Sequence, residues 1–284
     1  MVPVDFQEGR LVMNKGLSLR YRAWLPEQPR MGLIMVHGAG ESLEQYHHLG
    51  VRLARSAIAG LMFDLRGFGH SGGRSGHVDR FEDYVEDLDQ MVQYFREVTG
   101  LGRICLMGHS LGGLIATRYA QNRPRGVSAL ILSAPAFGLH LHLPAYAGKC
   151  IRFFSRVLPL LHIQPLPIIN RLRRYPRLFS YFTRLFGQEF RDPAPRSYSF
   201  RWIDEILIHV RESFRYIPNL TLPTLCICGA KDPLVNWETV QSFFDRLPTE
   251  EKEWHLLADA DHCFIHEGRS PSAIDTIIDW VNRR

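Results

Sequence analysis

The sequence predicts an α/β fold in which helices cover both faces of a mostly parallel sheet. Short apolar runs typical of buried strands alternate with amphipathic stretches typical of helices, and this alternation favours parallel pairing. The chain has 284 residues, 45% of them hydrophobic, which suffices for one large domain with an insertion. A serine flanked by glycines at a strand–helix junction indicates where such a sheet would carry chemistry.

The first half of the chain supplies strands and helices in turn. Alternating apolar residues at 17–24 predict a half-buried antiparallel strand in an edge hairpin. Continuous apolar runs predict buried parallel strands at 32–36, 61–63 and 104–107. Helical periodicity predicts helices at 46–57, 81–98 and 114–120.

The second half continues the pattern after an interruption. A buried strand is expected at 127–132, followed by a stretch rich in proline and arginine that extends to about residue 222 and contains short helical pieces. Regular alternation then returns, with strands expected at 224–228 and 254–257 and helices at 238–246 and 271–282. We therefore expect a core formed by 1–136 and 218–284, and an inserted helical cap or lid at 137–217.

The positive charge of the chain is concentrated in this insertion. The formal net charge is +5, yet thirteen basic residues stand against five acidic ones between Gly138 and Arg215, so the remainder is slightly acidic. Apolar residues interleave with these cations, as at 150–154 and 177–182. Two interpretations stay open: a segment that lies on an anionic membrane surface, or a solvated helix face whose arginine stems cover apolar neighbours. The interleaving and the lack of a groove-reading motif argue against nucleic-acid binding.

Several absences in the sequence predict a cytoplasmic protein. The N-terminus resembles no secretion signal, and no stretch of eighteen uncharged apolar residues occurs. Five irregularly spaced cysteines make a poor disulfide framework. Cys226 and Cys228 share one face of a strand that is expected to be buried. We therefore expect the cysteines to be thiols in the core and not the ligands of a metal site. The oligomeric state, monomer or homodimer, stays open.

The segment Gly108-His109-Ser110-Leu111-Gly112 carries the candidate nucleophile. An apolar run leads into it and a helical segment leads out, which is the setting of a nucleophile elbow. Bulk beside the serine would clash with the neighbouring strand and helix, and Gly108 and Gly112 supply the room. The turn also places Ser110 at the positive end of a helix, where backbone N–H groups can stabilise an oxyanion.

Ser110 needs a base, and the base needs an acid that orients it. The order nucleophile, acid, histidine selects Asp232, which follows an apolar strand and a glycine, with Asp259 and Asp261 as competitors. His262 is the expected base because it lies in the loop between the last strand and the final helix. His255 and His266 are its rivals: the first belongs to the strand itself and the second comes a turn later.

The oxyanion hole requires two backbone donors near the developing charge. Leu111, directly after the nucleophile, supplies one, and Ala39 in the glycine-rich loop 37–40 is placed for the other. His37 and His109 lie at tight turns, where packing or hydrogen bonding is the expected role. His109, as the neighbour of Ser110, is also a candidate substrate-binding residue.

These motifs together resemble one known family. His-Gly-Ala-Gly-Glu at 37–41, Asp-Leu-Arg-Gly-Phe-Gly-His-Ser at 64–71, the stretch 76–88, Gly-His-Ser-Leu-Gly-Gly at 108–113, and Asp232 with His262 resemble the monoacylglycerol lipase and lysophospholipase family of α/β-hydrolases. The resemblance covers both halves of the core, whereas the insertion matches only through Asp192-Pro193. It implies the α/β-hydrolase fold, with a mostly parallel eight-stranded sheet, helices on both faces and an inserted helical cap.

The resemblance also implies a serine hydrolase that cleaves esters of single-chain lipids without a metal or organic cofactor. It places Glu41 near the polar head group as a substrate-binding residue. Gln45 stands where some members carry an arginine, and His266 is offset by one position from their second histidine, so the head group stays open.

Monoacylglycerol is the first substrate we expect and lysophospholipid the second, with the apolar cap supplying an acyl tunnel. A general carboxylesterase, a thioesterase, an acyltransferase or a cofactor-free haloperoxidase would use the same triad. A protein of another class, a non-catalytic lipid-binding member of the fold, would not need all three residues.

Overall fold

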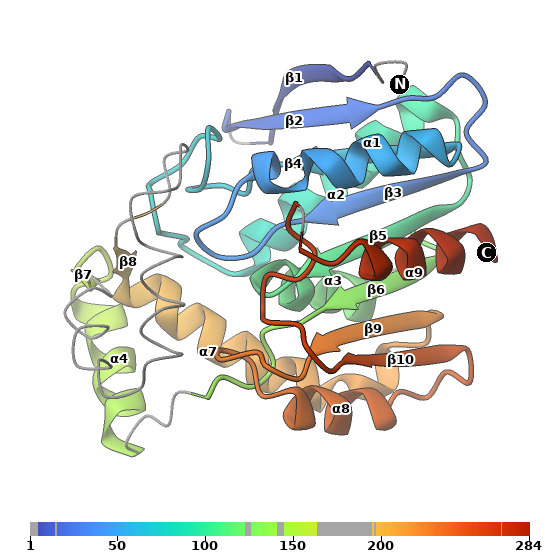
Figure 1. Ribbon diagram of the computed structural model, residues 1–284. Coiled ribbons are helices and arrows are strands. Elements are labelled where there is room, and N and C mark those ends of the chain that lie inside the picture. Colours follow the sequence, from blue (N-terminus) through green and yellow to red (C-terminus); the bar gives the residue numbers. More distant parts are fainter. Residues whose placement is uncertain are drawn as a thin grey trace.

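An eight-stranded sheet forms the centre of the computed structural model, which describes residues 5–14, 16–122, 126–140, 145–163, 195, 197–267 and 269–284 (Figure 1). The strand order is β1-β2-β4-β3-β5-β6-β9-β10. The strands are β1 (Gln7–Val12), β2 (Ser18–Trp24), β3 (Met31–Val36), β4 (Ile58–Phe63), β5 (Ile104–His109), β6 (Ala129–Ser133), β9 (Thr224–Gly229) and β10 (Lys252–Leu257). Only β2 runs in the direction opposite to the other strands of this sheet, so the mostly parallel sheet is confirmed.

Helices cover both faces of the sheet, as the sequence predicts. One apolar core lies under α1 (His47–Arg55) and α9 (Pro271–Asn282), and a second lies under α2 (Glu82–Thr99), α3 (Leu111–Asn122) and α8 (Trp237–Asp245). The central parallel strands are buried along their whole length because they contact both cores, which explains their continuous apolar sequences.

The edge hairpin is confirmed. The strand predicted from the alternation at 17–24 is β2. It pairs in antiparallel register with β1, and Gly9, for example, lies opposite Tyr21. The sequence does not single out β1, because its side chains are mostly exposed and lack an apolar period. Strand β4 begins three residues before the predicted start, since Ile58 and Ala59 pair with β3 as well.

The chain between β6 and β9 leaves the sheet at the carboxyl edge of the parallel strands (Figure 1). Its described elements are α4 (Ala145–Val157), β7 (His162–Ile163), β8 (Tyr198–Ser199), α7 (Phe200–Arg215) and the short 3-10 helix Ile217–Asn219; another 3-10 helix, Leu43–Tyr46, precedes α1. The predicted signature Asp192-Pro193 falls outside the described residues. The division into a core and a cap at 137–217 stays a prediction.

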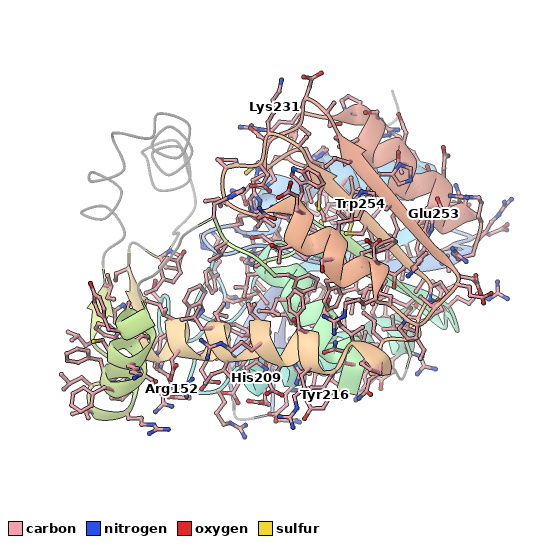
Figure 2. All side chains as sticks on the ribbon, turned by 90° about the horizontal axis from the view of Figure 1, so that it is seen from below. Arg152, His209, Tyr216, Lys231, Glu253 and Trp254 are labelled. Carbon is pink, nitrogen blue, oxygen red and sulfur yellow. The ribbon has the colours of Figure 1, made fainter. Side chains whose placement is uncertain are left out.

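Helix α7 contacts the core directly. The Trp202 indole N–H donates to the Tyr84 hydroxyl (3.0 Å), and the His209 ring stacks on Phe81 with centroids 4.1 Å apart. The Gln121 amide donates to the carbonyl of Ser213 (2.8 Å). Figure 2 shows α4 beyond the far end of α7, with Arg152 and His209 labelled on the two helices. Helix α7 is thus anchored to α2, α3 and the residue that precedes α2.

Within the described residues, no helix is both long and apolar enough to cross a membrane.

Gly50 allows α1 to lie close to the sheet. A Cβ at this position would come within 2.4–2.5 Å of the ring of Trp24, which is fully buried. We expect Gly50→Ala to lower the free energy of unfolding by about 1–3 kcal/mol, because the overpacking outweighs the higher helix propensity of alanine. Urea unfolding followed by circular dichroism measures it.

Gly148→Ala is the matched control. Gly148 lies inside α4 with nothing within 4 Å of the added carbon, so the same substitution should raise stability by up to about 1 kcal/mol. Equal effects at the two positions would contradict the packing argument.

Candidate active site

The turn between β5 and α3 holds Ser110 in a strained backbone conformation. Its φ is +51°, a region that L-residues with a side chain rarely adopt. The Ser110 N–H donates to the carbonyl of Ser133 (3.0 Å), and the Ser110 carbonyl accepts from Leu114 (3.2 Å) and Ala136 (3.0 Å). Three backbone bonds therefore fix the residue that the sequence predicts as nucleophile.

The two flanking glycines are required sterically. A Cβ on Gly108 would lie 2.2 Å from the Gly112 carbonyl oxygen, and one on Gly112 would lie 2.0 Å from that of Val36. Strand β5 and helix α3 thus meet backbone to backbone, and α3 also touches the end of β3. This is the strand–turn–helix geometry that the pentapeptide predicts.

His262 and Asp232 lie together at the carboxyl edge of the sheet. The His262 Nδ1–H donates to Asp232 Oδ2 (2.6 Å), and both side chains are buried. The other carboxylate oxygen accepts from the N–H groups of Leu234 (2.8 Å) and Val235 (2.9 Å). The carboxylate is fixed by its own turn, so it can hold the imidazole in one orientation and one tautomer.

Two loops bring this pair together. At the end of β9, a Cβ on Gly229 would lie 2.4 Å from the Ala260 carbonyl oxygen, and the Lys231 N–H donates to that same carbonyl (3.0 Å). The loop after β10, which carries His262, therefore packs against the turn that carries Asp232. The two residues are thirty positions apart in sequence.

The competing acids and bases face other groups. Asp259 is largely exposed and binds Lys231, while Asp261 accepts from the Cys263 N–H and binds Arg269. His255 is partly exposed on β10, 3.8 Å from Glu253.

Charge interactions set the pKa values of the buried pair in opposite directions. Burial by itself would lower the pKa of His262, but the Asp232 carboxylate raises it above its usual range. Burial would likewise raise the pKa of Asp232, but the His262 charge and hydrogen bonds hold it below. The carboxylate is thus ionised at neutral pH and stabilises positive charge on the ring.

A second buried carboxylate lies under the glycine-rich loop after β3. Glu41 Oε2 accepts from the Gly38 N–H (2.7 Å) and from the Tyr46 hydroxyl (2.5 Å). Glu41 Oε1 lies 3.2 Å from His266 Nε2 and 3.5 Å from His109 Nε2. Glu41 therefore links the loop that contains Ala39 to the helix start at Tyr46 and to the loop that carries His262.

The charges in this cluster follow from burial and hydrogen bonding. Burial lowers the pKa of His109 to about 3, so its ring is neutral, and its Nδ1 faces the Ser133 carbonyl (3.1 Å) and must carry the proton. Burial would also lower the pKa of His266, but Glu41 overrides it and raises the value to about 10. The pKa of Glu41 lies well below its usual range despite burial. Glu41 and His266 thus form a buried ion pair.

The remaining predicted residues lie around the same edge. His37 bridges the backbone, because its Nε2 accepts from the Leu65 N–H (3.0 Å) and its Nδ1–H donates to the Gly38 carbonyl (2.7 Å). This is the hydrogen-bonding role that the sequence predicts for it. The substrate-binding roles of Glu41 and His109 stay predictions, since both side chains are buried among protein groups.

Sequence reasoning missed two members of this site. The sequence predicts Tyr46 only as a helix start, and it presents His266 as a rival base and as a residue offset by one position from the second histidine of the resembled family. The sequence does show that His266 follows His262 by four residues in the same loop, which places both histidines near the site. It does not identify Glu41 as the residue that His266 binds.

Comparison with known proteins identifies the family. The family described as "Serine aminopeptidase, S33" (Hydrolase_4) matches residues 27–269, most of the chain. The chain belongs to this family. It is 26% identical over 270 residues to a monoacylglycerol lipase of Mycolicibacterium smegmatis, covering 94% of this chain and 93% of that one. It is 24% identical over 273 residues to lysophospholipase L2 of Escherichia coli, covering 88% and 80%.

Solved structures support the fold of this family member. The crystal structure of a monoacylglycerol lipase of Paleococcus ferrophilus has a TM-score of 0.75 at 22% identity, and 98% of each chain is covered. A soluble variant of monoglyceride lipase from Saccharomyces cerevisiae, in complex with a substrate analog, has a TM-score of 0.78 at 20% identity, with 98% and 95% covered. The α/β-hydrolase fold is confirmed, and the chain is a carboxylic ester hydrolase.

The ion pair between Glu41 and His266 makes the stability of the fold depend on pH. The pKa of His266 is raised from 6.5 to about 10, so its stabilisation is complete below pH 6.5 and is lost as pH rises towards 10. We expect the free energy of unfolding to fall over this range, and His266→Gln to flatten the fall. Urea titrations at a series of pH values measure it.

His255→Gln serves as the control, because that ring is partly exposed and lies 3.8 Å from the partly exposed carboxylate of Glu253. A wild-type profile that matches that of His266→Gln would show that no buried ion pair exists.

Proposed function

We propose that this carboxylic ester hydrolase uses Ser110 as nucleophile, His262 as general base and Asp232 as the residue that orients the base. The observation that carries the proposal is the strained turn at Ser110 on the same sheet edge as the buried His262–Asp232 pair, whose members lie 2.6 Å apart. A weak hydroxyl nucleophile needs this combination of exposure on a sharp turn and a base held in one tautomer.

In the first half-reaction, Ser110 Oγ attacks the ester carbonyl carbon and its proton passes to His262 Nε2. Asp232 stabilises the imidazolium through Nδ1–H without taking the proton. The C–O bond to the alcohol then breaks, and the alcohol leaves with the proton from Nε2. Water attacks the acyl-enzyme by the same route, which releases the fatty acid and restores Ser110.

We propose the Ala39 and Leu111 N–H groups as the oxyanion donors. The neighbouring Gly38 N–H is already bound to Glu41, so it is not available for the oxyanion. In this proposal Glu41 and His109 affect substrate binding from beneath the loop. Glu41 holds the loop through Gly38, and the neutral ring of His109 packs beside His262, with centroids 4.7 Å apart.

Monoacylglycerol is the substrate we propose first. The relatives named monoacylglycerol lipase and monoglyceride lipase, which the chain matches over almost its full length, support a single-chain lipid ester. Lysophospholipid is the second candidate, favoured by the similarity to lysophospholipase L2 and by the basic residues of the insertion, which would attract an anionic head group.

We also propose that α4 contacts the lipid surface from which such substrates are taken. Tyr146, Phe153 and Val157 are each more than half exposed on this helix. Lys149, Arg152 and Arg156 lie on the same helix. An exposed apolar stripe with cations beside it is the composition of a helix that lies in a membrane interface.

The first experiment compares fatty-acid release from monoacylglycerol and lysophosphatidylcholine that carry the same acyl chain. We expect faster release from the glyceride, and Ser110→Ala should lower both rates by about 10⁴- to 10⁶-fold because it removes the nucleophile. Folding of the variant is checked by its thermal transition.

Preference for the phospholipid would make lysophospholipid the substrate instead. Retained turnover in purified Ser110→Ala would refute the triad. Labelling of wild type by a fluorophosphonate separates the catalytic proposal from a lipid-binding protein without catalysis, because a disarmed triad would not react.

Co-sedimentation with vesicles tests the role of α4. We expect the double variant Phe153→Ser, Val157→Ser to sediment several-fold less than wild type with vesicles that contain phosphatidylserine. The control is Val12→Ser, Val98→Ser, which removes two exposed apolar side chains elsewhere and should sediment like wild type. Equal loss in both double variants, or no wild-type sedimentation, would contradict this role.

A further inference from the structure

The Nε2 atom of His109 is buried and has no hydrogen-bond partner among the described residues. Because Nδ1 carries the proton towards the Ser133 carbonyl, Nε2 presents a lone pair. That lone pair faces Glu41 Oε1 at 3.5 Å, another electron-rich atom. An unpaired acceptor opposite a carboxylate is costly in a buried site unless a positive group lies between them.

We propose that Glu41, His109 and His266 form a binding site for a first-row divalent cation, for which Zn²⁺ is the probe. Two imidazoles and one carboxylate are a known ligand set for zinc. The three donor atoms, one from each residue, all lie within 4.8 Å of one another. The mechanism of ester hydrolysis proposed above needs no metal, so the ion would take no part in the chemical steps of that reaction.

The distances fit such an ion. Zn–N and Zn–O distances of about 2.0–2.1 Å in a tetrahedral site place neighbouring ligand atoms about 3.3 Å apart. Glu41 Oε1 lies 3.2 Å from His266 Nε2 and 3.5 Å from His109 Nε2. The third edge, between the two imidazole nitrogens, is at most 4.8 Å. A movement of His266 would bring these two nitrogens to the required distance, and His266 has the most exposed side chain of the three, at 12%.

The groups behind the ligands already hold them in place. The Ser133 carbonyl fixes His109 in the tautomer that leaves Nε2 free to bind a metal. Gly38 and Tyr46 both bind Oε2 of Glu41, so Oε1 remains directed at the histidines. Only the proton on His266 Nε2 must leave, and the hydroxyl of Tyr46 can keep its bond to Glu41 when it does.

The ion would add positive charge close to the proposed base. The His109 ring lies 4.7 Å from that of His262, centroid to centroid, so a dication bound to His109 opposes protonation of His262. If the proposed function holds, zinc therefore slows acylation. This consequence rests on that function, whereas binding of the ion does not.

A second cluster in the described chain provides a matched control. Glu82, Glu205 and His209 also gather within 4.8 Å, where α2 meets α7. There Glu82 is half exposed, and Glu205 accepts from the Phe81 N–H (2.8 Å). Because one carboxylate is half exposed to solvent and the other already accepts a hydrogen bond, we expect weaker zinc binding at this cluster.

Calorimetric titration with Zn²⁺ tests the proposal on the full chain without a histidine tag. All proteins carry Cys150→Ser to remove an exposed thiol that would compete. We expect one equivalent to bind tightly. His109→Gln and His266→Gln should each weaken that binding at least about 10-fold, and His209→Gln should leave it unchanged. Co²⁺ absorption reports whether nitrogen and oxygen ligands surround the ion.

Far-UV circular dichroism confirms that each variant is folded, and the two ligand variants test the site independently. Loss in both with retention in His209→Gln supports the site. Absence of stoichiometric binding, equal binding in all proteins, or loss in His209→Gln alone would overturn it. A chain that binds zinc but cleaves no ester would refute the proposed function and leave this site standing.

Discussion

A Cβ atom on Gly112 would lie 2.0 Å from the carbonyl oxygen of Val36, and one on Gly108 would lie 2.2 Å from that of Gly112. No side chain separates β5 from α3 at this point, nor α3 from the end of β3. The chain therefore turns within one residue, and Ser110 takes a φ of +51°. Because α3 starts here, the ends of β3, β5 and β6 lie close together. The loops that follow these strands therefore contribute to one site.

Two buried carboxylate–imidazole pairs lie on either side of His109. Asp232 binds His262, and Glu41 binds His266, while the His109 ring is within 6 Å of both histidine rings, centroid to centroid. The pairs differ in the other hydrogen bonds that fix the carboxylate. Asp232 is fixed by its own turn, whereas Glu41 is fixed by Gly38 and Tyr46 and thereby ties the loop after β3 to the loop after β10.

The position of Gln45 clarifies how charge is arranged in this member of the family. Gln45 Oε1 accepts from the backbone N–H (2.8 Å) and the hydroxyl (3.1 Å) of Ser42 and caps the short helix that follows. The positive charge opposite Glu41 comes from His266. A histidine in this role can lose its proton and bind a metal, which an arginine cannot do.

The sequence alone determined the layered architecture and the nucleophile turn, because both depend on local patterns. Strand and helix periodicities persist over a few residues, and the glycines around Ser110 are needed by a turn only five residues long. From the order of the residues along the chain, the sequence also favoured Asp232 as the acid and His262 as the base. Only the tertiary structure decided which carboxylate faces which ring: Asp232 meets His262, and Glu41 meets His266 across 225 positions. Such contacts leave no local signal, because they arise where strand order brings distant loops to one edge of the sheet. The packing of α7 on Phe81 and Gln121 likewise joins residues that are far apart in the sequence.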